Sequence, residues 1–176
     1  FAIVDYSFGD DVANNVTGIV FRAQEGAFLV GYIAGMTTKT NKVGFIGGMK
    51  NVIIDQFQYG FEAGVLYAAK ERNVPIEVVN QYAESFADAA KGKAIASSMY
   101  SGGCDIVFHA AGGVGYGVIE AAKDSNKFVI GVDRDQSYLA PDNVLTSAVK
   151  NVGTAVKLVS RELMDGNQIG GRDYEF

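Results

Sequence analysis

The sequence predicts an α/β fold with a mostly parallel sheet, and three observations lead to this prediction. Short runs of apolar or β-branched residues alternate almost without a break with longer segments of helical periodicity. Glycine accounts for 22 of the 176 residues, which suits many tight turns between strands and helices. Hydrophobic residues make up 48% of the chain, enough for one good core or two small ones. Strands that alternate with helices in this way form βαβ units with helices on both faces of the sheet.

Seven segments have the composition of β-strands: residues 1–4, 16–20, 42–46, 76–79, 105–110, 128–132 and 144–149. Gly47 and Gly48 end the third strand, Gly112 and Gly113 follow the fifth, and Asp133 ends the sixth. In doubly wound sheets, ligands bind outside the carboxyl ends of the strands. These strand-ending residues are therefore the first candidates for a binding site.

Five segments have apolar residues three and four positions apart, as expected of helices that pack on a sheet. The longest is ended by Asn73 and Pro75, and Gly166 closes the last. Ser85 is the expected N-cap of the third helix, with Asp88 where a capping box prefers Glu or Gln. The predicted helices cover residues 24–36, 52–72, 85–100, 114–125 and 154–164.

Charge and cysteine content exclude several classes of protein. The net charge is −5 and there is no basic run, so the chain is a poor partner for nucleic acid or an anionic membrane surface. The single cysteine, Cys104, allows no internal disulfide, and with one histidine it leaves almost no ligands for a soft metal. No apolar run reaches the length of a membrane span. The chain opens within a strand and without Met, so we expect it to be trimmed at its N-terminus.

The sequence offers no convincing catalytic machinery. His109 lies within an apolar strand, where a buried histidine is the simpler interpretation than a general base. Cys104 has no cationic neighbour in sequence that would lower its pKa, and we interpret it as structural. Asp133 and Asp135 resemble a catalytic carboxylate pair, but Asp135 is equally suited to stabilise its own loop. Neither a P-loop nor a G-x-S-x-G serine motif is present. We therefore expect a protein that is not an enzyme and has no metal or cofactor.

A glycine-rich turn leaves one nucleotide-dependent alternative open. Gly113 and Gly115 follow a strand and open a helix, and Asp133 ends the next strand twenty residues after Gly113. In a dinucleotide-binding motif that acidic residue would bind ribose hydroxyls. The third glycine of the motif is replaced by Val118, so a plain βα turn explains the pattern as well.

Aromatic and carboxylate side chains near strand ends favour a binding protein. An aromatic face can stack on a planar base or a sugar, and an Asp can accept hydrogen bonds from two neighbouring hydroxyl groups. For any single ring a place in the core remains the simpler interpretation. The aromatic candidates are Tyr6, Phe8, Phe108 and Tyr116.

Several ordered motifs resemble the basic membrane protein (BMP) family, the PnrA-like substrate-binding lipoproteins of ABC transporters. The matching motifs are KVGFIGG at 42–48, the pattern Ile54-x-x-Phe57-x-x-Gly60-Phe61-x-Ala63-Gly64, DIVF-x-AAGG at 105–113, VIGVD-x-DQ at 129–136 and LTS-x-x-K at 145–150. The resemblance implies a type I periplasmic-binding-protein fold with two Rossmann-like lobes. It would make residues 1–40 a remnant of the N-terminal lobe, 41–143 the C-terminal lobe, and 144–176 a return segment and tail. Earlier βα units of the N-terminal lobe would be absent.

The resemblance also implies a ligand and a set of contacts. Asp133 and Lys150 would bind the ribose of a nucleoside, with a purine nucleoside as the expected ligand, and Phe108 would stack on its base. Asp5 and the backbone at Gly47, Gly48, Gly112 and Gly113 would line the site. Hinge closure would deliver the nucleoside to an ABC transporter permease, and a lipid outside this chain would anchor the protein. It would then act at the extracytoplasmic face of the membrane or in the periplasm. A nucleotide- or NAD-dependent enzyme and a ligand-sensing regulatory domain are the alternatives.

Overall fold

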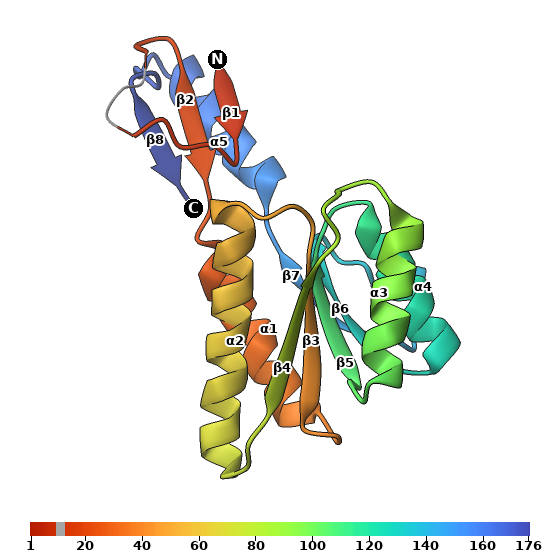
Figure 1. The fold of residues 1–176 in the computed structure, drawn as a ribbon. Coiled ribbons are helices and arrows are strands. Elements are labelled where there is room, and N and C mark those ends of the chain that lie inside the picture. The colour runs from red at the N-terminus through yellow and green to blue at the C-terminus, as the bar shows by residue number, and fades with distance from the viewer. Residues whose placement is uncertain (10–12) are drawn as a thin grey trace. The chain divides into compact units, whose positions relative to one another are not determined.

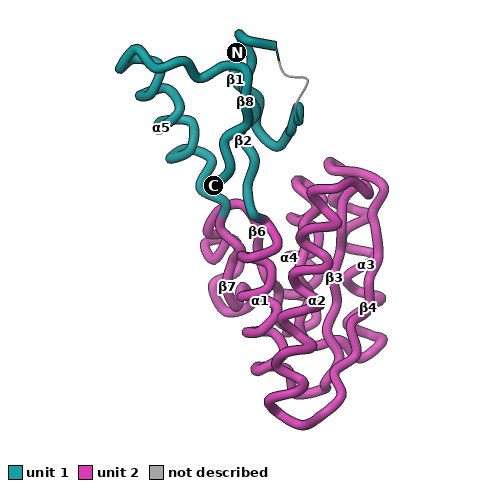
Figure 2. Tube along the Cα trace, turned by 90° about the vertical axis from the view of Figure 1, so that its left-hand side faces the viewer, with its two compact units in different colours: residues 1–22, 150–176 teal, residues 23–149 magenta. Residues whose placement is uncertain are grey.

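The computed structural model describes residues 1–9 and 13–176, which form two compact units. Unit 1 consists of residues 1–22 and 150–176, and unit 2 of residues 23–149 (Figure 2). These boundaries differ from the predicted segments 1–40, 41–143 and 144–176. The reason is that helix α1 (Ala23–Thr37), placed by the prediction in the N-terminal lobe, packs closely along helix α2 (Val52–Arg72) of unit 2.

Unit 2 is a five-stranded sheet in which all neighbouring strands are parallel, in the order β4-β3-β5-β6-β7. Helices α1 and α2 cover one face, and α3 (Ala89–Ser101) and α4 (Val114–Ser125) cover the other (Figure 1). The predicted α/β architecture is confirmed. The strands are β3 (Lys42–Gly47), β4 (Glu77–Tyr82), β5 (Ile106–Ala110), β6 (Phe128–Asp133) and β7 (Val144–Val149), with a short 3₁₀ helix η1 (Ser137–Leu139) before β7.

The core of unit 2 lies on both faces of the central strand β5, because alternate side chains of a strand point to opposite faces. Phe45 and Phe108 pack against α1 and α2, whereas Val107 packs on the α3–α4 side. At the amino end of β5, the buried carboxylate of Asp105 accepts hydrogen bonds from the Thr38 hydroxyl (2.6 Å) and from two backbone N–H groups of the loop before β3. These bonds attach the α1–β3 loop to the centre of the sheet.

Helices α1 and α2 approach each other so closely that their contact requires glycine. A side chain at Gly31 would overlap the backbone of Phe61, and one at Gly64 would overlap the backbone of Phe28. Dense packing of this kind tolerates no added methyl group without a backbone shift.

The start of α3 differs from the prediction. The cap is Asp88, whose carboxylate accepts the N–H of Lys91 (2.9 Å), so the helix begins at Ala89 and not near Ser85. The Ser85 hydroxyl instead accepts the N–H groups of Ala87 and Asp88 within the preceding loop. Ser and Asp are both good N-caps, but the prediction placed Asp88 at the third position of the helix instead of at its cap.

Unit 1 is a three-stranded parallel sheet in the order β1-β2-β8, formed by β1 (Ala2–Val4), β2 (Thr17–Val20) and β8 (Arg172–Glu175). Helix α5 (Val152–Met164) packs Ala155 and Val159 on Ile19 of the middle strand. Strand β8 was not predicted. Within the described part of the chain, no helix has the length and apolar character needed to cross a membrane.

Candidate functional site

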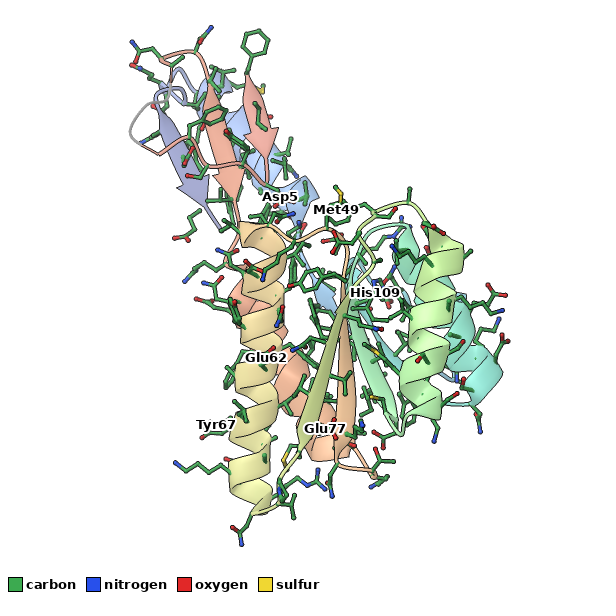
Figure 3. The ribbon with its side chains drawn as sticks, in the orientation of Figure 1. Asp5, Met49, Glu62, Tyr67, Glu77 and His109 are labelled. Atoms are coloured by element: carbon green, nitrogen blue, oxygen red, sulfur yellow. The ribbon has the colours of Figure 1, made fainter. Side chains whose placement is uncertain are left out.

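The strand-ending residues of unit 2 lie at one edge of its sheet, because the carboxyl ends of parallel strands meet at the same edge. Figure 3 labels Met49, which follows β3 at this edge, and Glu77, which begins β4 at the opposite edge. The turn after β3 is joined to β5 by a hydrogen bond from Gly48 N–H to the Ala110 carbonyl (3.0 Å). The predicted candidates Gly47, Gly48, Gly112, Gly113 and Asp133 are therefore brought together.

The glycines at this edge make room for Phe86, a residue of the β4–α3 loop. A side chain at Gly48 would overlap the Phe86 ring, and the Gly113 N–H donates to the Phe86 carbonyl (2.8 Å). Gly112 has a positive φ of 57°, which favours glycine. Phe86 as a residue is 36% exposed, so this edge presents a partly exposed aromatic residue.

Phe108, the predicted stacking residue, lies in the core instead of at this edge. Its side chain is fully buried, and its ring packs against Phe45, Phe57 and Phe61 at centroid distances of 5.2 to 6.2 Å. A ring buried in this way has no face on which a ligand could stack. Phe86 was not among the predicted candidates because it falls within the predicted helix over residues 85–100, whereas in the structure it lies in the loop before α3.

Asp133 ends β6 with an exposed side chain and a positive φ of 67°. The N–H of Arg134 donates to the Val132 carbonyl (2.8 Å), and the Arg134 guanidinium donates to the Tyr116 hydroxyl (2.8 Å). Hydrogen bonding to Ser137, first of all from its backbone N–H, lowers the pKa of Asp135. Asp135 therefore stabilises its own loop, one of the two roles that the sequence left open.

The turn before α4 offers little to a dinucleotide. The first backbone N–H groups of the helix already donate within the turn, from Val114 to the Ala111 carbonyl (3.2 Å) and from Gly115 to the Gly112 carbonyl (3.1 Å). Pyrophosphate binding at a helix N-terminus requires such groups to point at the ligand. Val118, which stands where the motif needs its third glycine, is fully buried. These contacts favour the plain βα turn.

Unit 1 contains the two remaining predicted site residues, and they form an ion pair. The Lys150 ammonium lies 2.6 Å from Oδ2 of Asp5, and 5.6 Å from the centre of the Phe21 ring. Asp5 follows β1 with a positive φ of 61° (labelled in Figure 3). Its Oδ1 is buried and has no hydrogen-bond partner among the described residues, so it has capacity for a further donor.

The reactive residues considered from the sequence are buried. Burial raises the pKa of the Cys104 thiol to about 11 and lowers the pKa of His109 to about 4. Neither group is therefore prepared for nucleophilic or general base chemistry near neutral pH. Residues 1–9 and 13–176 hold no cluster of three or more His, Cys, Asp or Glu side chains arranged for a metal ion.

The same fold occurs in solved structures of solute-binding proteins. The structure is similar to that of an ABC transporter solute-binding protein from Aeropyrum pernix K1, with a TM-score of 0.91 and 28% identity over 99% of this chain and 50% of that one. A transcriptional activator of the comK gene from Bacillus halodurans shares the fold, with a TM-score of 0.84 and 24% identity over the whole chain and 58% of that one. The chain thus has the type I periplasmic-binding-protein fold.

Residues 1–174 match the family described as ABC transporter substrate-binding protein, PnrA-like, and the chain belongs to this family. Basic membrane protein B of Borreliella burgdorferi is 48% identical over 98% of this chain and 51% of its own length. Basic membrane protein B of Borrelia garinii subsp. bavariensis is 50% identical over 95% of this chain and 49% of its own. The chain spans about half the length of these curated relatives. The resemblance found in the sequence motifs is confirmed.

Proposed function

We propose that the protein binds nucleosides, and purine nucleosides in particular, as the substrate-binding component of an ABC importer, without catalysing a reaction on them. Asp133 accepts hydrogen bonds from the ribose hydroxyl groups, and the exposed part of the Phe86 ring packs on the base. The protein closes about a hinge when the ligand binds and delivers it to a permease. It is anchored by a lipid at the extracytoplasmic face of the membrane.

The observation that carries the proposal is the placement of Asp133 and Phe86 at one edge of one sheet. The Phe86 carbonyl accepts a hydrogen bond from the Gly113 N–H in the turn after β5. Asp133 ends β6, the strand next to β5. A carboxylate that accepts two hydrogen bonds beside a partly exposed ring matches a ligand with a diol and a planar base. Membership of a PnrA-like substrate-binding family supports the same ligand class.

The test is calorimetric titration of the protein with inosine, guanosine, adenosine, cytidine and NAD. We expect a purine nucleoside to bind and NAD to give no signal. Asp133→Ala should weaken nucleoside binding by at least about tenfold, because a hydrogen bond to a charged group contributes roughly 1.5–3 kcal/mol. Phe86→Ala should weaken nucleoside binding by a similar factor, because the stacking of a base on an aromatic ring contributes about 1–3 kcal/mol.

Asp142→Ala is the matched control, since it also removes one exposed carboxylate, but in the loop that leads into the amino end of β7. This variant should bind as the unchanged protein does. Binding of NAD alone would overturn the proposal in favour of the nucleotide-dependent alternative. Absence of binding by all four nucleosides, or equal affinity of the Asp133→Ala and Asp142→Ala variants, would refute the nucleoside assignment.

A further inference from the structure

The backbone that presents Asp133 is held in an unusual turn. Asp133 has a φ of 67°, and the N–H of the following residue, Arg134, donates to the carbonyl of the preceding one, Val132 (2.8 Å). A three-residue turn closed by such a bond around a residue with positive φ is the classic γ-turn, which is rare and strained. Strain at a non-glycine residue persists only where the surrounding structure imposes it.

The side chain of Gln136 supplies that constraint. Its Oε1 accepts the N–H of Val132 (2.9 Å), and its own backbone N–H donates to the Ser147 hydroxyl on β7 (3.2 Å). Gln136 is 5% exposed, and its bond to the Val132 N–H is buried. The fit is tight, because a Cβ at Gly131 would lie 2.6 Å from the Gln136 Oε1 and 2.5 Å from the Ser147 Oγ.

The register of the sheet explains why this side chain is needed. The pairing of β5 with β6 ends at Ile130, opposite Phe108, whereas β6 continues to Asp133. The Phe128 N–H donates toward β5, to the Asp105 carbonyl, and alternate residues of a strand repeat this direction. The N–H of Val132 therefore points to the β5 side beyond the last paired residue, and Gln136 Oε1 takes the place of the missing strand carbonyl.

We infer that Gln136 is a positioning residue, which fixes the γ-turn that presents the Asp133 carboxylate to the ligand. The inference rests on the proposed function, in which Asp133 binds the ribose hydroxyls. Without the Gln136 acceptor, the Val132 N–H would be buried and unpaired. The turn would then relax to a geometry that pairs it with water, and Asp133 would move with it.

The experiment compares Gln136→Met, which keeps the volume but removes the acceptor, with Gln136→Glu, which retains an oxygen for the Val132 N–H. Thr38→Val is the control, since it removes a buried hydrogen bond to Asp105 at the opposite edge of the same sheet. Two quantities are measured: the backbone conformation of Asp133 by NMR couplings and chemical shifts, and the affinity ratio of a ribonucleoside to its 2′-deoxy analogue.

In Gln136→Met we expect Asp133 to leave its positive φ and the affinity ratio to fall by about tenfold, the change that one misplaced hydrogen bond to a carboxylate produces. Gln136→Glu should restore both, and Thr38→Val should change neither. An unchanged Asp133 conformation in Gln136→Met, or an equal loss of affinity for both nucleosides, would overturn the inference. If the unchanged protein binds no nucleoside, the proposed function fails, and the Asp133 conformation alone decides the positioning role.

Discussion

The only histidine of the chain makes the stability of unit 2 depend on pH in a way that can be calculated. His109 is fully buried on β5, and its ring lies directly against the first turn of α4, where a side chain at Gly115 would overlap it (His109 is labelled in Figure 3). Its ring nitrogens have no hydrogen-bond partner within the described structure. Burial lowers its pKa from 6.5 to about 4, and Gln136 lies near enough to oppose the shift slightly but not in hydrogen-bonding geometry.

The size and sign of the effect follow from this shift. Below pH 6.5 the unfolded chain binds a proton at His109, whereas the folded chain stays neutral there until about pH 4. The unfolding free energy therefore has its full value, as far as His109 is concerned, above about pH 6.5, and it decreases as the pH falls toward 4. One pKa unit corresponds to about 1.4 kcal/mol, so the loss reaches about 3 kcal/mol, a large part of the about 5–15 kcal/mol that stabilises a typical domain.

The assay is urea unfolding at a series of pH values between neutrality and about pH 4, with His109→Gln as the variant that cannot titrate. The carboxylates are common to both proteins, so the difference between their unfolding free energies isolates the histidine. We expect this difference to change by about 3 kcal/mol against the unchanged protein across the window. Parallel curves, or an NMR titration of this single imidazole near pH 6.5 in the folded state, would refute the reasoning.

Two further predictions concern packing and a buried carboxylate. Gly64→Ala should lower the unfolding free energy by about 1–3 kcal/mol, because the added Cβ would overlap the Phe28 backbone. Gly26→Ala should raise it by about 0.5–1 kcal/mol, because Gly26 lies within α1 and has open space around it. Urea unfolding midpoints measure both changes, and equal effects of the two variants would contradict the packing argument. Asp105→Asn should lower the unfolding free energy by about 1–3 kcal/mol, because an amide cannot accept all three of the hydrogen bonds that the two carboxylate oxygens accept. An unchanged urea midpoint at neutral pH would contradict this expectation.

The sequence predicts an element of the fold correctly where the local spacing of apolar residues matches the contacts that the element makes in the structure. The prediction of a helix over residues 52–72 is confirmed, since its apolar spacing is the face that packs on the sheet and Asn73 caps its end with a positive φ of 53°. Strand β8, in contrast, could not be predicted from its local sequence. Its residues Arg172–Glu175 are mostly charged, and the strand exists because it pairs with β2 far away in the sequence. No local periodicity marks a strand of that kind.

The strand-end positions of the candidate site residues were predictable from the sequence, but the exposure of the aromatic candidates was not. Glycine pairs and a terminal aspartate mark the carboxyl edge of a parallel sheet, so Gly48 and Asp133 could be identified from spacing. Phe108 was chosen over Phe86 because it lies near the end of a predicted strand, whereas Phe86 falls within the predicted helix over residues 85–100. What separates them is burial: β5 is covered on both faces, whereas the β4–α3 loop is not.

Asp133 offers a last test of whether its backbone strain serves the fold or the ligand. A non-glycine residue in the left-handed region costs about 1 kcal/mol or more, although Asp tolerates it better than most residues. Glycine at this position would relieve the strain but lose more chain entropy on folding, so the two effects nearly cancel. We therefore expect Asp133→Gly to keep its unfolding free energy within about 1 kcal/mol while losing nucleoside binding as Asp133→Ala does. Destabilisation by clearly more than that would show that the carboxylate supports the fold itself, because glycine preserves the turn and removes only the side chain.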